Sequence, residues 1–546
     1  MRTFISICLF LDFFFLGLSA KMPSVNELTL EEKVGQLLMV HFHGEQADPH
    51  VRSYILDLHI GGVIYYRGYN GLTSPQQVQS LSAELQTLAG EQRQPIPLLI
   101  AIDHEGGVVN HLTKGFTQFP GNGAVGKIGD CALAEQCAYA MGQELKGVGI
   151  NTNFAPVIDV NNNKQNPIIG IRSFGDDPQA VAALGKAMLA GFRQAAILAT
   201  LKHFPGHGDV TVDSHESLPV VQKDRQTLDQ MELYPFRHLL PCADAVMTAH
   251  LLVPALDAKN TVTFSQAAIT HLLRDEMAYE GLMITDSLIM QGALDQSNGV
   301  VDAAVKSFIA GHDILLLGGR QLIADNKELE VTPAEIQEIH RTLVEMVKTG
   351  LLSEVRLNQS VAKILKIKES YQLKCGEEVV KEDLAQTVNT PAHKRLAQKI
   401  ADASVEIVSS LPHRKLNLGT QKILCIAPAF CSENLFESVI NRLTSNSFFY
   451  KGLNPTIDDI AAAATAASAA DLCVLCTYKS WRNPMQAELA AALLKKGIPT
   501  VVLMLGDAWD QTAFAASPLV ICTYSPAPCA LNAAAALIEK EFHEAL

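Results

Sequence analysis

Short apolar runs alternate with longer amphipathic segments from about residue 30 to residue 319. The runs begin at Ile60, Pro97, Ile150, Ile197, Asp244, Gly281 and His312, and KVGQLLMVHF near the start is a possible eighth. Segments between them, such as PQQVQSLSAELQTLAG, repeat apolar residues at the three- and four-residue spacing of helices. Nearly continuous apolar strands separated by helices indicate a parallel sheet covered on both faces. About eight such units predict a (β/α)8 TIM-like barrel.

Charged and imidazole side chains follow these runs where the strands are expected to end. They are Asp103, Glu105, Asp159, Lys202, His203, His250 and Asp286. A single one could be a core polar group or a helix cap. The carboxyl ends of barrel strands converge on one mouth, however, and active sites of this fold are built there. Together these residues therefore predict an active site at that mouth.

The pattern changes after Gly319 to two long helices, PAEIQEIHRTLVEMVKTG and VRLNQSVAKILKIKESYQL, and a connector of mixed charge. From about Pro391 a second α/β module follows, with strands expected in KILCIAP, DLCVLCTY, PTVVLML and PLVICTY. We expect a smaller αβα sandwich of four or five strands, without a carboxylate cluster or a catalytic residue. The predicted organisation is a signal peptide over residues 1–20, a catalytic barrel over 21–330, a helical connector and linker over 331–390, and the sandwich over 391–546.

The first twenty residues, MRTFISICLFLDFFFLGLSA, have a basic start, an apolar run and small residues before Lys21. This layout is typical of a secretory signal peptide, although Asp12 interrupts the run. We therefore expect an exported protein, periplasmic or secreted, or a cytoplasmic one if the segment is not a functional signal. Nothing later has about 20 uninterrupted apolar residues, so no membrane-spanning segment is expected.

Composition and cysteine usage narrow the function classes. The formal net charge of −14 over 546 residues argues against nucleic acid as a partner, because such proteins usually carry a basic face. Ten cysteines remain beyond Cys8, mostly in apolar runs, and we interpret them as buried thiols, with disulfides left open. Cys473 and Cys476 have the spacing of half a zinc site, but no second pair completes it.

The segment KHFPGHGDVTVDSHESLP, residues 202–219, concentrates candidate chemistry in a stretch broken by glycine and proline. One hypothesis is a metal-dependent barrel of the amidohydrolase kind, in which His41 and His43 combine with Lys202, His250 and a late Asp. The segment's own histidines all lie on one loop, whereas a metal barrel takes its ligands from several strands.

A second hypothesis is acid/base chemistry with a carboxylate nucleophile. Asp213 precedes His215 by two residues, so its carboxylate can orient the ring and stabilise the protonated form. Asp286, at the end of a strand, would be the fixed nucleophile, and the glycines of the loop would let the pair move over a substrate. A polar surface loop without chemistry is the third interpretation.

Five motifs in chain order carry a resemblance to a known family. IDHEGG, NFAPVIDVNNN with NPIIGIRSFGDDP, KHFPGHGDVTVDSH, VMTAH and GLMITDSLIM resemble glycoside hydrolase family 3, specifically its β-N-acetylglucosaminidase branch. The resemblance implies that Asp286 is the nucleophile, His215 the general acid/base and Asp213 its partner. It also implies sugar-binding roles for Asp103, Arg172, Lys202 and His203.

The reaction implied is a retaining double displacement by an exo-acting enzyme, with nucleophile and acid about 5 to 6 Å apart and no metal or cofactor. The expected partner is an amino-sugar oligosaccharide or a muropeptide, and the expected assembly is a monomer. Peptidoglycan fragments and chitin oligosaccharides would both fit, and phosphorolysis in place of hydrolysis stays open.

One departure from the family pattern concerns DHEGGVVNHL. Val108 and His111 occupy positions where the family commonly has arginine. This leaves the alternative of a degenerate member that binds amino sugars without cutting them.

Overall fold

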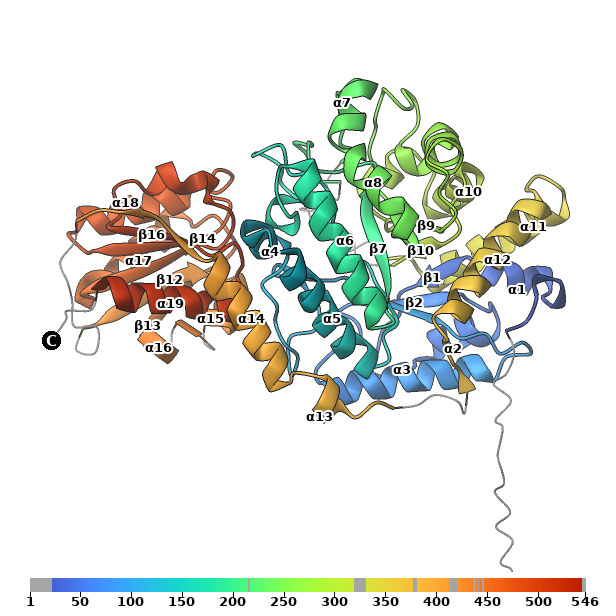
Figure 1. Cartoon of the computed structure of the whole chain (residues 1–546), viewed down its shortest axis with the longest axis horizontal. Helices are drawn as coiled ribbons and strands as arrows, with labels where there is room; N and C mark the ends of the chain where they lie inside the picture. The colour runs from blue at the N-terminus through green and yellow to red at the C-terminus, as the bar shows by residue number, and fades with distance from the viewer. Residues whose placement is uncertain are drawn as a thin grey trace, which may run out of the picture.

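The structure of the chain is a computed structural model that describes residues 22–214, 217–318, 330–376, 381–412, 421–435, 438–439, 441–443 and 446–542. Two α/β units lie side by side, the larger built from the first part of the chain and the smaller from the last (Figure 1). The predicted signal peptide, residues 1–20, lies outside the described residues.

The larger unit is an eight-stranded parallel α/β barrel, as predicted. Its strands are β1 (Leu38–Val40), β2 (Gly62–Tyr65), β3 (Leu99–Ile102), β6 (Thr152–Asn153), β7 (Leu198–Phe204), β8 (Ala245–Thr248), β9 (Leu282–Thr285) and β10 (Leu315–Leu317). They pair in the order β10-β1-β2-β3-β6-β7-β8-β9. A parallel bridge between Ile284 and Ile314 links the two ends of this order, so the ring is nearly closed. Each predicted run supplies one strand.

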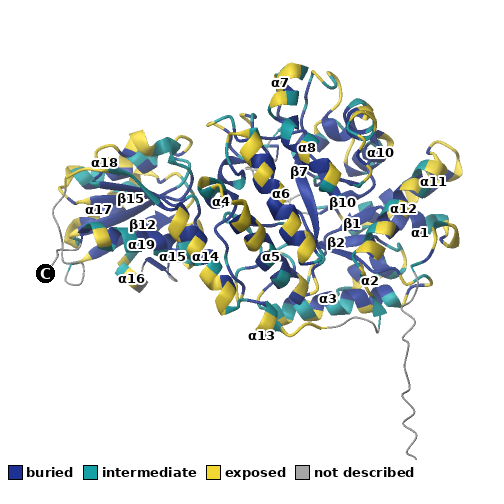
Figure 2. Ribbon diagram, viewed as in Figure 1, coloured by how far each residue is buried: buried dark blue, intermediate teal, exposed yellow. Residues whose placement is uncertain are grey.

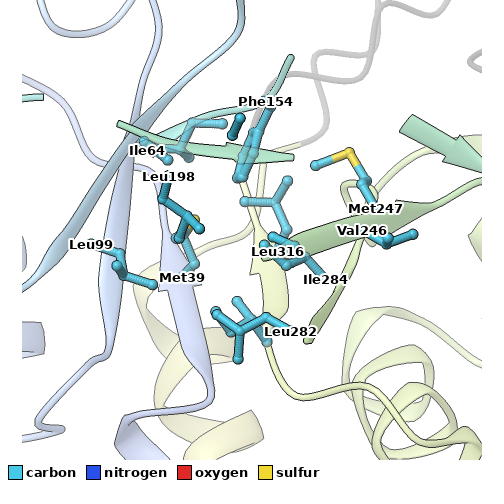
Figure 3. Close-up of a cluster of buried hydrophobic side chains, with 14 of the residues drawn as sticks. Met39, Ile64, Leu99, Phe154, Leu198, Val246, Met247, Leu282, Ile284 and Leu316 are labelled. Carbon is cyan, nitrogen blue, oxygen red and sulfur yellow. The ribbon is translucent and has the colours of Figure 1, made fainter. Parts of the chain in front are cut away.

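Side chains fill the inside of the barrel. Figure 3 shows this packing with apolar side chains from several strands, among them Met39, Ile64, Leu198, Ile284 and Leu316. All of these are buried. Because a barrel of this size has a packed interior and not a pore, its chemistry is confined to the loops at the ends of the strands.

Helices surround the barrel where the apolar spacing predicts them. They include α1 (Leu30–Gly35), α2 (Pro49–Leu56), α3 (Pro75–Gly90), α4 (Asn122–Ile128), α5 (Cys131–Gly147), α6 (Pro178–Gln194), α7 (Arg225–Gln230), α8 (Leu233–Leu239), α10 (Val300–Ala310) and the π-helix η5 (Ala267–Glu276). Ser74, Asp130 and Asp177 cap α3, α5 and α6 by accepting hydrogen bonds from first-turn N–H groups. α5 and α6 pack side by side on the outer wall (Figure 1).

The two long helices of the predicted connector are α11 (Pro333–Lys348) and α12 (Glu354–Ser370). Their buried residues, such as Ile339 and Ile364, belong to the same apolar core as the barrel. α11 packs on α10 and α1, so these helices cover the barrel wall. A short helix, α13 (Leu384–Thr387), then leads to the second unit.

The second unit has a six-stranded sheet between two helical layers. Its strands are β11 (Glu406–Ser410), β12 (Ile423–Pro428), β13 (Asn446–Tyr450), β14 (Leu472–Thr477), β15 (Thr500–Met504) and β16 (Leu519–Cys522), in the order β11-β16-β15-β14-β12-β13. α14 (Pro391–Ser404) and α19 (Pro528–Phe542) share one apolar cluster, and α17 (Ile457–Ala466) and α18 (Met485–Lys495) share the other.

The sheet has more strands than the four or five expected. The four strands predicted from apolar runs, β12, β14, β15 and β16, are fully buried, but β11 and β13 are partly exposed along most of their length. Both lie at the edges of the sheet, where one side has no neighbouring strand. An edge strand therefore lacks the continuous apolar run on which the prediction depended.

Polar contacts join the two units. Glu144 on α5 accepts a hydrogen bond at 2.8 Å from the His393 ring on α14, and both side chains are buried. Figure 2 shows buried strands such as β7 and β15 in the interior of each unit, with exposed residues on the surrounding helices. Lys127 pairs with Glu406 at 2.7 Å. Within the described ranges, the ten cysteines are free thiols, and no helix is long and apolar enough to cross a membrane.

Candidate active site

Four charged side chains form a balanced cluster at the carboxyl ends of β3 and β7. Lys202, near the end of β7, contacts Asp103 at 2.6 Å and Glu105 at 2.7 Å. Arg172, from the short helix η2 (Gly170–Arg172), donates two hydrogen bonds of 2.9 Å to the carboxylate of Glu105. Two cations thus face two anions, and the fork of Arg172 is held in a bidentate geometry.

Burial and the neighbouring charges have opposite effects on the pKa values of these groups. Burial opposes ionisation of Glu105, but Arg172 and Lys202 outweigh it and lower the pKa of Glu105 to about 2. Burial also opposes the charge on Lys202, yet Asp103 and Glu105 raise the pKa of the lysine above its usual value. Glu105 and Lys202 are therefore both charged at neutral pH, and Lys202 and Arg172 are fixed donors at the mouth of the barrel.

His203 is fixed by a buried carboxylate on one side and the arginine on the other. Its Nδ1 lies 2.7 Å from Asp159 Oδ2, and its Nε2 lies 3.4 Å from Arg172 Nη2. Because arginine can only donate, Nε2 is the accepting nitrogen and Nδ1 carries the hydrogen that Asp159 accepts. Burial would raise the pKa of Asp159, but His203 and His207 together lower it, so this aspartate is an ionised anchor.

The loop that carries Asp213 is attached to the residues that follow Asp286. The carbonyl of Ser214 accepts a hydrogen bond of 3.1 Å from the N–H of Gly292, in α9 (Gln291–Leu294). The Ser214 hydroxyl lies 3.1 Å from His207 Nε2. Burial and the neighbouring His203 lower the pKa of His207 to about 4, so a neutral ring supports the loop at neutral pH. The two loops are therefore joined at the mouth of the barrel.

Asp286 directly follows β9, as the sequence predicts for a rim residue. Its N–H donates to the carbonyl of Thr248, and its Oδ1 accepts a hydrogen bond of 2.7 Å from the N–H of Ser287. Tyr66, half-buried just beyond β2, lies within electrostatic reach of it: loss of solvent raises the pKa of this tyrosine well above its usual value, and the charges of Asp103 and Asp286 raise it further. Tyr66 is thus a neutral hydroxyl near the site that the sequence analysis did not single out.

The carboxylates of the site differ in exposure. Asp103, Asp213 and Asp286 are half-buried, whereas Glu105 and Asp159 are buried behind them. The accessible carboxylates are thus the predicted substrate-binding and catalytic ones, whereas Glu105 holds Arg172 and Lys202 and Asp159 holds His203. His215 lies outside the described residues, so its role stays a prediction.

The second unit contributes a side chain that the sequence analysis missed. Lys479, two residues after β14, donates a hydrogen bond of 2.5 Å to the carbonyl of Pro167 in the barrel. Burial and the positive charge of Arg172 lower its pKa to about 8, and Asp213 and Asp507 act in the opposite direction. The lysine therefore lies within electrostatic reach of both the charged cluster that contains Arg172 and the loop that carries Asp213.

The expectation of no carboxylate cluster in the second unit is wrong. Asp507 and Asp510 line a small pocket with Tyr478, Lys479 and the barrel residue Ile171. Burial raises the pKa of Asp507 to about 6, and the nearby charge of Asp510 adds to this effect. The sequence signal that could have found these carboxylates is the segment GDAWDQ, which follows the predicted strand PTVVLML. The barrel residues were identified by the same criterion, a position just beyond the carboxyl end of a predicted strand.

The structure does not assemble the ligand set of the metal-dependent hypothesis. Lys202 is held by Asp103 and Glu105. His250 is held by the Thr263 hydroxyl at 2.8 Å and by the Ser287 carbonyl at 2.9 Å. Both side chains therefore have structural partners, and His250 supports the residue that follows Asp286.

His111, one of the two departures from the family pattern, lies beside the site. Its ring packs edge-on against Tyr66 with a centroid separation of 5.6 Å. Burial lowers the pKa of His111, while Asp103 acts against this. A neutral aromatic ring thus lies where the family commonly has a cation. Val108 is half-buried in the same loop.

Known proteins are similar to this chain in sequence and in structure. Residues 29–367 match the glycosyl hydrolase family 3 N-terminal domain. A curated beta-hexosaminidase A from Pseudoalteromonas piscicida is 35% identical over 436 residues, 73% of this chain and 71% of that protein. A beta-hexosaminidase from Hydrogenovibrio crunogenus is 32% identical, over 61% of this chain and 93% of its own length.

A solved structure extends the likeness to both units. The glycoside hydrolase family 3 beta-N-acetylglucosaminidase from Paenibacillus sp. strain FPU-7 is 34% identical with a TM-score of 0.84, covering 94% of this chain and 97% of its own. A barrel with this charged rim, a family match over more than half of the chain and these relatives agree: the chain is a glycoside hydrolase and belongs to glycosyl hydrolase family 3.

Proposed function

We propose that the chain is a retaining exo-β-N-acetylglucosaminidase that removes terminal β-linked N-acetylhexosamine. The names of its relatives support the activity. The observation that carries the mechanism is the hydrogen bond between Ser214 and Gly292, because it places the loop of Asp213 against the residues that follow Asp286.

In this mechanism Asp286 attacks the anomeric carbon while His215 protonates the leaving oxygen, giving a covalent glycosyl-enzyme. His215 then removes a proton from water, which attacks the same carbon and releases the sugar in its original configuration. Asp213 orients the imidazole and stabilises its charged form. The site binds the sugar with fixed groups: Asp103, Arg172 and Lys202 face its hydroxyls, and His203 is held in one tautomer.

We further propose that the natural substrates are peptidoglycan fragments and that the protein is exported and monomeric. A peptidoglycan fragment without its stem peptide carries an N-acetylmuramic acid whose lactyl group is a free carboxylate, and a chitin oligosaccharide has no such anion. Lys479, within electrostatic reach of Arg172 and Asp213, offers a cation that would favour the anionic substrate.

The activity and the acid role are tested together with aryl N-acetyl-β-glucosaminides. His215→Ala should lose far more activity on a poor leaving group than on an activated aryl group, which needs little protonation. His238→Ala, at an exposed histidine, is the control and should match the wild type on both. Equal losses on the two substrates would contradict the acid role.

Two further readouts separate the alternatives. NMR of the first-formed sugar should show the β anomer, and an α product would exclude retention. Turnover should not change when phosphate is added, and a phosphate-dependent sugar phosphate would identify a phosphorylase instead. Substrate binding without turnover in any assay would identify the degenerate binder.

A further inference from the structure

Two histidines at the carboxyl end of β1 lie beside a carboxylate from after β10. His43 Nε2 lies 2.8 Å from Glu330 Oε2, and His41 Nε2 lies 3.9 Å from the same oxygen. The three potential ligand atoms all lie within 4.8 Å of one another. Among the residues that the structure describes, no other three His, Cys, Asp or Glu side chains form such a group.

The hydrogen bonding of His41 leaves a lone pair facing the carboxylate. Its Nδ1 is 3.2 Å from the carbonyl oxygen of Leu317, which can only accept, so Nδ1 carries the hydrogen. The His41 side chain is only 2% exposed, so its ring is held in place by the surrounding protein. Nε2 therefore points away from the Leu317 carbonyl and lies 3.9 Å from Glu330 Oε2, where a cation bound between the two atoms could be shared by both.

The spacing of the ligand atoms fits a small divalent ion. Zinc binds nitrogen and oxygen at about 2.0 to 2.1 Å, so two ligand atoms at tetrahedral angles are about 3.3 Å apart. The 2.8 and 3.9 Å separations at Glu330 Oε2 lie on either side of this value. Shifts of about half an ångström would bring these two separations to that value.

We propose that His41, His43 and Glu330 bind a divalent transition-metal ion, with Zn²⁺ as the ion that this ligand set suits best. Two imidazoles and one carboxylate form a three-ligand set to which water adds a fourth ligand. His43 is 56% exposed in its side chain, so the ion has access from solvent. The carbonyl of Leu317 fixes the His41 ring from behind, as outer hydrogen bonds of metal-binding histidines do.

The site is separate from the groups that face the substrate. The ring of Tyr69 packs on His43 at 4.6 Å and on His41 at 5.4 Å between centroids. Tyr69 in turn contacts Tyr66 at 5.9 Å, and Tyr66 lies by Asp103 and Asp286. The ion would therefore brace one wall of the mouth through two tyrosines, without supplying a ligand to the reaction.

Isothermal titration of the metal-free full chain with ZnCl₂ tests the proposal. We expect one ion per chain, with affinity weakened at least about tenfold in His43→Ala and in Glu330→Gln. His43 is exposed and Glu330→Gln keeps the size of the side chain, so both variants should fold. The matched control is His50→Ala, at an exposed histidine nearby, which should bind as the wild type does.

A fourth variant separates this site from the catalytic loop. His215→Ala should keep the zinc affinity, and X-ray absorption at the zinc edge should report two imidazole ligands in wild type and one in His43→Ala. The proposal is overturned if the wild type does not bind zinc, if His43→Ala and Glu330→Gln bind it unchanged, or if His215→Ala alone abolishes binding. None of these outcomes depends on hydrolytic activity, so the proposed function stands or fails separately.

Discussion

The rim of the barrel and the matching edge of the second unit carry similar residues in different electrostatic states. At the rim, Glu105 and Lys202 are buried and paired, and each remains charged. At the edge of the second sheet, burial moves the pKa of Asp507 up to about 6 and that of Lys479 down to about 8, toward their neutral forms. The barrel therefore has compensated charges in place before substrate arrives, whereas the second unit supplies groups whose charge is incompletely compensated.

The largest effect on activity is expected when the proposed nucleophile of the barrel is removed. Asp286→Asn should reduce kcat by about 10³-fold or more, because the amide cannot form the covalent intermediate. The control is Asp275→Asn, at an exposed aspartate on η5, which should leave kcat unchanged. Steady-state kinetics on an aryl glycoside measure kcat. If Asp286→Asn had the kcat of the wild type, Asp286 could not be the nucleophile.

The second test addresses charge compensation inside the barrel. Glu105→Gln should lower the free energy of unfolding at pH 7 by about 3 kcal/mol, because Arg172 and Lys202 lose a buried partner. The folded-state pKa of Glu105 is lowered to about 2, so its stabilisation is present above the unfolded value near 4.5 and is lost as pH falls toward 2.

Urea titrations at pH 7, 5 and 4 measure this difference in free energy. The gap between wild type and Glu105→Gln should be equal at pH 7 and 5 and begin to narrow at pH 4. Glu338→Gln, which breaks a surface pair with Arg341, is the matched control and should leave the free energy of unfolding nearly unchanged, because solvent screens this pair. A gap that widens on acidification would contradict the assigned ionisation.

The third test asks what the second unit adds. Lys479→Met should lower kcat/KM on N-acetylglucosaminyl-N-acetylmuramic acid by about tenfold, the worth of a hydrogen bond to a charged group, with little effect on chitobiose. Lys479→Arg keeps the charge and should recover part of the loss. Equal losses on the two disaccharides would show that Lys479 only supports the barrel loop through Pro167 and does not recognise the carboxylate of the substrate.

The smallest effect is expected at Asp507. Its raised pKa means that ionising it in the folded protein is unfavourable, so stability is lost as pH rises from about 4 to about 6. Asp507→Asn should therefore gain about 1 kcal/mol at pH 7.5 and nothing at pH 4, since asparagine can also accept the N–H of Trp509. Thermal unfolding at the two pH values measures this, and a loss at pH 7.5 would contradict the assignment.

The sequence predicted most of the barrel because buried parallel strands are read directly from apolar runs, and each run from IGGVIYY to HDILLLG contains its strand. The convergence of Asp103, Lys202 and Asp286 on one mouth followed from the same rule. The edge strands β11 and β13 were missed since half-exposed strands have no such run.

What the sequence could not give was contact between distant segments. Lys479 reaches the barrel loop only through the packing of the second unit, more than 300 residues along the chain from Pro167. Likewise, Glu330 joins His41 and His43 only because β10 lies next to β1 in the barrel. The sequence pattern identifies candidate site residues at strand ends, but the tertiary packing determines which of them come into contact.

Mass spectrometry after inactivation with a 2-fluoro glycosyl substrate analogue is the most direct test of the central claim, that Asp286 attacks the sugar. The analogue slows release of the glycosyl-enzyme, so the covalent intermediate accumulates on the nucleophile. We expect one glycosyl label per chain, on the peptide that contains Asp286. A label on Asp103, Asp213 or any other residue would contradict it.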